Sequence, residues 1–234
     1  MSTTRFTNGV TTASPAETLG RFVALDPTKV IAYFNDFHTY AAGDWVVTET
    51  SAGATQALGD GLGGLLVLTA TAADNDLIGL QLAKEGFLIQ AGKEAWFKAR
   101  FKVSDATQSD LLMGLHITDT SPVASAPTDG IVIRKDDGDA LLDGVVLIDN
   151  AAASTSTGIG TLVDDTFITV GFHFDGASVV RFYVNDAEKA AVTLTAANIA
   201  ALDDETLALS FAFQTGEAEA QVSTVDYVFA AVER

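Results

Sequence analysis

The segment 96–103 constrains the fold of this chain more than any other part of the sequence. Apolar residues alternate there with cationic ones along one continuous run. The apolar members are Phe97, Ala99, Phe101 and Val103, and the cationic members are Lys98, Arg100 and Lys102. Successive side chains of a β-strand point to opposite faces of the sheet. The alternation therefore predicts a half-buried strand with one apolar face and one cationic face.

Similar apolar runs recur along the chain, separated by short polar or glycine-containing turns. We expect about a dozen strands in all. The runs are 30–34, 45–48, 65–71, 77–82, 96–103, 111–118, 130–134, 145–148, 167–174, 179–184, 190–194, 207–213 and 225–232. The Asn185-Asp186 pair predicts a hairpin turn, and 196–202 predicts one short helix capped by Thr195. This pattern is typical of an all-β protein, and we expect an antiparallel β-sandwich.

Composition and charge exclude several classes of protein. Of the 234 residues, 48% are hydrophobic and none is cysteine, which excludes disulfides, thiolate catalysis and cysteine-ligated zinc. The formal net charge of −18 opposes binding to nucleic-acid phosphates. The most apolar run, 65–68, is far too short to span a bilayer, and residues 1–20 lack the apolar core of a signal peptide. We expect a soluble, unprocessed chain with neither nucleic acid nor membrane as a partner.

The first 30 residues differ from the rest of the chain. They show neither the period of a strand nor that of a helix, and they carry a net charge of +1 on an acidic protein. We expect an extended N-terminal arm over residues 1–30, which either orders on a partner or packs on its own domain. The residues expected to contact a partner are Arg5, Phe6, Asn8, Val10, Leu19 and Phe22.

The candidate catalytic motifs are weak. The segment 59–64 matches the letters of a dinucleotide-binding loop, but a strand pattern follows it where a helix is required, so a β-turn is the better interpretation.

His38, His116 and His173 do not have metal-ligand spacing. A sandwich glycosidase needs two acids across the scissile bond, and the nearest candidate, Glu217-Ala-Glu219-Ala-Gln221, is better read as a solvated hairpin face. We expect no catalytic residues, no metal, no cofactor and no enzymatic activity.

Two charged clusters allow more than one interpretation. Aspartates gather between 136 and 165 without a calcium-loop spacing, which favours solvated turns over an ordered calcium ion. They are Asp136, Asp137, Asp139, Asp143, Asp149, Asp164 and Asp165. The basic residues Lys93, Lys98, Arg100 and Lys102 either contact an acidic partner or polysaccharide, or form the solvated face of a strand.

The body of the chain resembles concanavalin-like (laminin-G-like) jelly-roll sandwiches. Short segments that span roughly residues 31–234 carry the resemblance through their order along the chain. They are Tyr33-Phe-Asn-Asp-Phe37, Phe97-Lys-Ala-Arg-Phe101, Gly114-Leu-His-Ile117, Val170-Gly-Phe-His-Phe174, Arg181-Phe-Tyr-Val-Asn185 and Asp226-Tyr-Val228. The resemblance implies the fold but not the function, because lectins and hydrolases share it.

The opening of the chain resembles that of head-associated structural proteins of tailed phages. The resemblance covers about 45 residues, from Arg5-Phe-Thr-Asn-Gly-Val-Thr-Thr-Ala13 through Leu19-Gly20, Asp26-Pro-Thr-Lys29 and Tyr33-Phe-Asn-Asp-Phe37 to Trp45. It implies a virion structural protein, made in the host cytoplasm, that decorates or cements the capsid exterior. The implied partners are the major capsid protein and other copies of the chain in a homo-oligomer, for instance a trimer.

Two other functions remain open at this stage. One is a carbohydrate-binding or adhesion module of a phage fibre or spike, for which Trp45, Trp96 and Tyr40 are the candidate aromatic platforms. The other, less favoured, is a sandwich glycosidase that uses Glu217 or Glu219.

Overall fold

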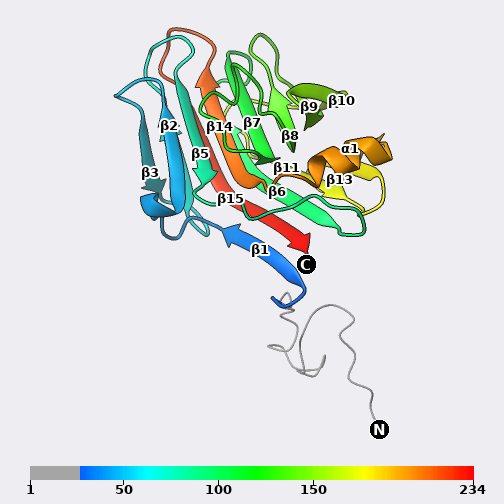
Figure 1. Ribbon diagram of the computed structural model, residues 1–234. Helices are drawn as coiled ribbons and strands as arrows, with labels where there is room; N and C mark the ends of the chain where they lie inside the picture. Colours follow the sequence, from blue (N-terminus) through cyan, green and yellow to red (C-terminus); the bar gives the residue numbers. More distant parts are fainter. Residues whose placement is uncertain (1–26) are drawn as a thin grey trace.

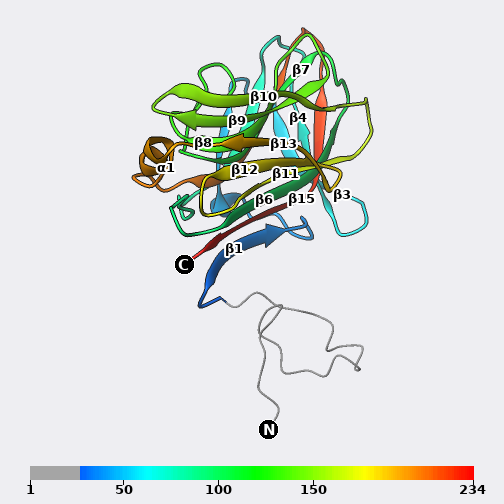
Figure 2. The ribbon, with the colours of Figure 1, turned by 90° about the vertical axis from the view of Figure 1, so that its right-hand side faces the viewer.

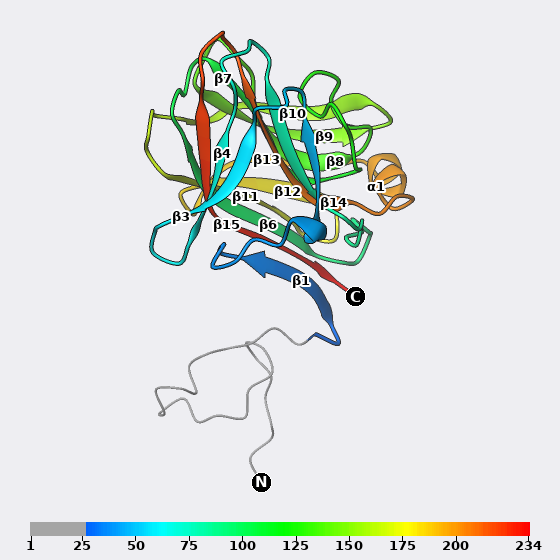
Figure 3. The ribbon, with the colours of Figure 1, turned by 90° about the vertical axis from the view of Figure 1, so that its left-hand side faces the viewer.

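Two antiparallel sheets pack face to face in the computed structural model, which describes residues 27–234 (Figure 1). The eight-stranded sheet has the order β13-β12-β11-β6-β15-β4-β3, and β1 also pairs with β15. Its strands are β1 (Val30–Asn35), β3 (Thr55–Gly59), β4 (Leu65–Thr69), β6 (Ala95–Val103), β11 (Ile168–Phe174), β12 (Val179–Val184), β13 (Ala187–Thr193) and β15 (Val222–Glu233). Figure 2 shows β12, β11, β6, β15 and β1 side by side, and Figure 3 shows β4 and β3 beyond β15.

The seven-stranded sheet forms the second layer, in the order β10-β9-β8-β7-β14-β5-β2. Its strands are β2 (Trp45–Glu49), β5 (Leu77–Leu82), β7 (Ser109–His116), β8 (Gly130–Lys135), β9 (Leu141–Ile148), β10 (Ala151–Thr161) and β14 (Ala208–Thr215). A one-turn 3-10 helix, η2 (Ala42–Asp44), precedes β2, and α1 (Ala196–Leu202) is the helix that follows β13. No helix within residues 27–234 is long and apolar enough to cross a membrane.

The alternation in 96–103 sets the packing of β6. Buried and partly exposed residues alternate along the whole strand, so its apolar side chains enter the core between the sheets. Phe97 stacks there on Phe172 of β11, with ring centroids 5.7 Å apart. The core is so closely packed that a Cβ atom at Gly144 would lie 2.5 Å from the Phe182 ring. The predicted all-β antiparallel sandwich is confirmed.

The predicted helix is confirmed together with its cap. The Thr195 side chain accepts a hydrogen bond from the Asn198 backbone N–H, and the Asn198 side chain accepts one from that of Thr195, which closes a capping box. The predicted turn over 59–64 also holds, since it joins β3 to β4 in a hairpin. Residues 1–26, which include the six expected arm contacts, lie outside the described residues, and β1 begins at Val30.

The outer faces of the two sheets differ. On the seven-stranded sheet, Leu112, Val132, Val145 and Leu147 form a second buried apolar cluster, separate from the main core. The loop 117–129 lies over this cluster, with Val123 and Ala126 packed against it. We call this side the covered face. The outer side of the eight-stranded sheet, which carries Trp96 and the cationic residues of β6 in partly exposed positions, we call the open face.

Candidate ligand-binding site

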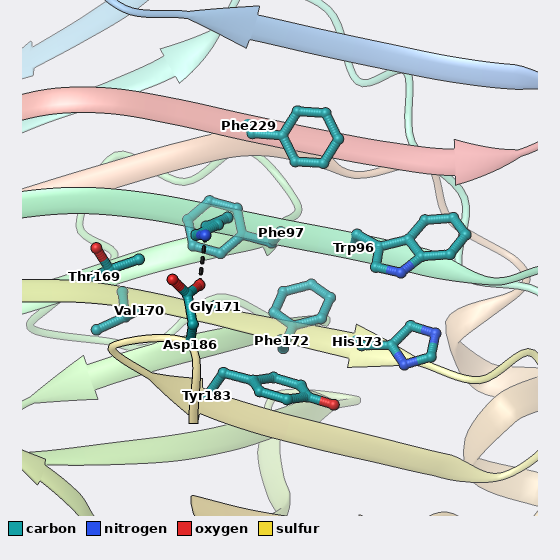
Figure 4. Close-up of a pocket in the computed structure, with 11 residues that line it drawn as sticks. Trp96, Phe97, Thr169, Val170, Gly171, Phe172, His173, Tyr183, Asp186 and Phe229 are labelled. Atoms are coloured by element: carbon teal, nitrogen blue, oxygen red, sulfur yellow. Dashed lines mark hydrogen bonds and ion pairs between the residues drawn. The ribbon is translucent and has the colours of Figure 1, made fainter. Parts of the chain in front are cut away.

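A depression lies on the open face, where β6, β11 and β12 are neighbours (Figure 4). Its volume is ≈ 260 Å³. Side chains from these strands, from β15 and from the turn after β12 surround it. They are Trp96, Lys98, Thr169, His173, Tyr183, Asp186 and Phe229. We call this feature the aromatic depression.

Strand register explains why the sheet is hollowed at this point. Lys98 pairs with Phe229 on one side and with Gly171 on the other, and Gly171 pairs with Tyr183. These four residues form one row across four strands, in which Gly171 alone has no side chain to fill the space. A Cβ atom at position 171 would lie 2.5 Å from the Phe97 carbonyl oxygen, so the close backbone approach also requires glycine.

One end of the aromatic depression is a stacked pair of rings. Trp96 and His173 pair across β6 and β11, and their rings lie 5.4 Å apart at an interplanar angle of 11°. The His173 Nε2 atom is 2.8 Å from a carboxylate oxygen of Glu94, which fixes the imidazole orientation. Figure 4 shows the Trp96 and His173 rings next to each other at this end of the hollow.

The other end is an ion pair. The tight turn between β12 and β13 places Asn185 and Asp186 at positive φ angles of 50° and 62°, as expected for a two-residue hairpin loop. The Asn185 side chain accepts a hydrogen bond from the Thr169 backbone N–H at 3.0 Å, and the turn brings Asp186 to Lys98. The hydrogen bond from Lys98 to Asp186 is the main reason that the pKa of Lys98 is raised.

Three polar groups around the hollow have no partner among the described residues. They are the Tyr183 hydroxyl, the Thr169 hydroxyl and the Trp96 indole N–H. All three are uncharged donors, and the two hydroxyls also accept hydrogen bonds. The aromatic depression therefore offers ring faces for an apolar surface and free hydrogen-bonding groups for hydroxyls on the same ligand.

The remaining cations of β6 are neutralised by neighbouring acids. Arg100 pairs with Asp226, and Lys102 lies 3.2 Å from Asp165. Arg100 also stacks on Phe167, with its guanidinium carbon 4.2 Å from the ring centroid. The cationic side chains of β6 are therefore held in ion pairs on a partly exposed strand face, which favours the solvated-face interpretation over contact with an acidic partner. Lys93, the fourth basic residue, donates to the Arg234 backbone carbonyl.

The three candidate platforms occupy different environments. Trp45 is only 5% exposed and packs edge-on against Phe211 and Tyr33, so it belongs to the core. Tyr40 is partly buried against the same core. Trp96 is the platform of the three that faces the aromatic depression.

The histidines do not form a metal centre. His116 is completely buried on the covered face, where its Nδ1 lies 2.7 Å from the Ile117 carbonyl oxygen. Burial lowers the pKa of His116 to about 4. His38 is exposed beside Asp36, and His173 contacts Glu94. Within residues 27–234 no group of three histidine or carboxylate side chains could hold a metal ion.

The acidic motif residues other than Asp143 lie in turns and loops. Glu217 and Glu219 lie in the connection that crosses from β14 in one sheet to β15 in the other. The expectation of a hairpin face is therefore wrong, because these two strands do not pair with each other. In the 136–165 segment, Asp164 lies between β10 and β11 and accepts a hydrogen bond from the Ala106 backbone N–H at 2.8 Å, as expected for a turn aspartate. Asp143 lies within β9 and accepts one from the Gly158 backbone N–H at 2.8 Å.

Comparison with known proteins identifies the fold. No protein family model and no curated protein matches the sequence. An endo-1,3-β-glucanase from Streptomyces sioyaensis matches the structure with a TM-score of 0.62 at 12% identity, over 90% of this chain and 99% of that one. The carbohydrate recognition domain of Emp47p matches with a TM-score of 0.59 at 13% identity, over 90% and 99% of the two chains. The chain has the concanavalin-like, lectin-type jelly-roll fold.

A further match is a protein of unknown function from Shewanella oneidensis, with a TM-score of 0.59 at 16% identity over 88% of this chain and 87% of that one. The fold expected from the order of the sequence segments is confirmed. Because enzymes and lectins both occur among these structures, the likeness alone does not assign an activity.

Proposed function

We propose that this chain is a non-catalytic carbohydrate-binding module that holds a sugar in the aromatic depression. The observation that carries the proposal is the combination of Trp96, Tyr183 and Phe229 around a hollow with three free hydrogen-bonding groups. Sugars present apolar C–H faces together with hydroxyls, so aromatic rings beside neutral donors suit both surfaces. The matching Emp47p domain is named for carbohydrate recognition, which supports the proposal.

The carboxylates at the aromatic depression favour binding over hydrolysis. A glycosidase uses two acids that face each other across the scissile bond, one to transfer a proton and one to attack or to activate water. The two acids beside the aromatic depression have other partners, because Asp186 is bonded to Lys98 and Glu94 to His173. Glu217 and Glu219 are not among the residues that line it.

A glycan array followed by calorimetric titration of the strongest binder tests the proposal. We expect Trp96→Ala to weaken binding at least about tenfold, since losing 1.4 kcal/mol of contact energy has that effect. Trp45→Phe is the matched control, because it changes a core tryptophan outside the aromatic depression. Absence of binding to any glycan, or a Trp96→Ala protein that binds like the wild type, contradicts the proposal.

We also propose, as a second candidate, that the chain is carried on a phage capsid. Its support is the resemblance of the opening residues to phage head proteins, together with the position of β1. That strand lies at the edge of the eight-stranded sheet and carries no charge, and its Phe34 is 59% exposed. An exposed, uncharged edge strand is suited to contact with another protein.

Light scattering after size-exclusion chromatography tests this second candidate, with the protein alone and mixed with capsids that lack it. We expect a defined homo-oligomer that co-elutes with capsids through the major capsid protein. Deletion of residues 2–25 should abolish co-elution, because Arg5, Phe6, Asn8, Val10, Leu19 and Phe22 are the expected contacts. A monomer that ignores capsids contradicts the virion role and leaves the carbohydrate proposal untouched.

A further inference from the structure

We infer that the ligand of the aromatic depression is a single uncharged sugar unit, and that the site discriminates against uronic acids and other anionic sugars. This inference rests on the proposed function and specifies its substrate class. It follows from how the charges, the neutral donors and the size of the hollow are arranged.

Both basic side chains at the site already have protein partners. Lys98 is held by Asp186 at one end, as Figure 4 shows, and His173 contacts Glu94 at the other. The Lys98 ammonium is additionally within reach of the Tyr227 hydroxyl. An anionic ligand that used either basic side chain would have to displace a carboxylate and then lie next to it, which is unfavourable for like charges.

The net charge of the whole protein also disfavours anionic ligands. The net charge is −18, and one further acid lies next to a residue that lines the hollow. Glu188 pairs with Tyr183 across β12 and β13. The field of so many acids lowers the local concentration of anions and leaves neutral solutes unaffected.

Neutral groups remain to bind a ligand. The hydroxyls of Tyr183 and Thr169 and the indole N–H of Trp96 lie on different sides of the hollow. The volume of ≈ 260 Å³ is below the range of about 300–1,000 Å³ that is common for drug-sized ligands. The hollow itself therefore holds one sugar ring.

Matched pairs of methyl glycosides test the inference, for example glucose with glucuronic acid and galactose with galacturonic acid. Titration calorimetry with the full chain compares the wild type, Asp186→Asn and Glu188→Gln. We expect the wild type to bind the neutral member of at least one pair about tenfold more tightly than its acid. Asp186→Asn frees the Lys98 ammonium and should reduce that preference about tenfold, in a manner that salt screens.

Glu188→Gln is the control, because it changes the net charge equally without releasing Lys98. It should reduce the preference much less than Asp186→Asn does. A wild type that binds the uronic acids as tightly as the neutral sugars overturns this inference while the proposed function stands. A wild type that binds no member of the panel contradicts the proposed function and this inference together.

Discussion

The two outer faces of the sandwich are built from sheets of similar size, yet they offer very different surfaces. On the covered face, Val132 and Val145 are completely buried beneath the chain's own loop 117–129. On the open face, paired charges and partly exposed rings surround a hollow centred on Gly171. Loop 117–129 therefore accounts for the burial of the covered face.

Unpartnered polar groups also differ between the covered face and the open face. On the covered face the backbone N–H of Asp119, in the overlying loop, donates to Gln81 at 3.0 Å, while the Nε2 atoms of Gln81 and His116 are buried without a partner among the described residues. On the open face the unpartnered groups line the hollow, where a ligand can reach them. An unsatisfied polar atom thus lowers stability on the covered face and, under the proposed function, provides a binding contact on the open face.

The largest difference between the faces should appear when the same charge is placed on each. Val132→Asp would bury an unpaired carboxylate under the loop, and we expect it to lower the free energy of unfolding by about 4 kcal/mol. Ala191→Asp on exposed β13 should change it by less than about 0.5 kcal/mol. Urea denaturation measures both values. Equal effects would show that the loop does not seal the covered face.

A second difference is expected in the response to acid. The pKa of His116 is about 4 in the folded state, below its ordinary value of 6.5. The unfolded chain therefore takes up a proton before the folded protein does. Stability is complete above about pH 6.5 and falls by about 3 kcal/mol as the pH drops toward 4.

Unfolding of His116→Asn across this pH range checks that expectation. The variant should lose most of the pH dependence between 6.5 and 4, whatever its absolute stability. His173→Gln is the matched control, because it changes a histidine of the open face and retains His116, so it should keep the wild-type slope. An unchanged slope in His116→Asn would refute a buried, neutral His116.

The smallest effect is expected for the ion pair at the aromatic depression. Asp186→Ala removes the partner of Lys98, but both side chains are more than a third exposed. Solvent screens such pairs, so the free energy of unfolding should fall by less than about 1 kcal/mol. Chemical denaturation at low and high salt measures the change. A loss above about 2 kcal/mol would mean that Asp186 has a structural role in addition to its role at the site.

Local patterns were sufficient to predict most strands. The alternation in β6 placed Phe97 inside and Lys98 outside, and it also puts Trp96 on the outer side with Lys98. Because Trp96 shares the outer side of the strand with Lys98, the pattern identifies it as an outward-facing residue. Trp45 is followed by apolar residues, so the pattern does not show which way it faces. The strands that sequence reasoning missed, β3 and β10, lie at sheet edges, where small and polar residues are tolerated.

The rest of the site depends on contacts between distant parts of the chain. Gly171, Tyr183 and Phe229 meet Lys98 only because β12, β11, β6 and β15 are neighbours in that order. Strand order and register are set by the packing of the whole sandwich, and no local pattern encodes them. The sequence therefore predicts individual outward residues but not the hollow that they form together.

Fluorescence titration of the Trp45→Phe protein tests the central claim most directly, because its remaining tryptophan, Trp96, lies in the aromatic depression. Addition of a neutral sugar found by the glycan array should change the Trp96 emission saturably, with the same Kd as calorimetry gives. The Trp96→Phe protein, which retains only the core Trp45, should show no change. Sugar binding that leaves the Trp96 emission unaffected would contradict a site on the open face.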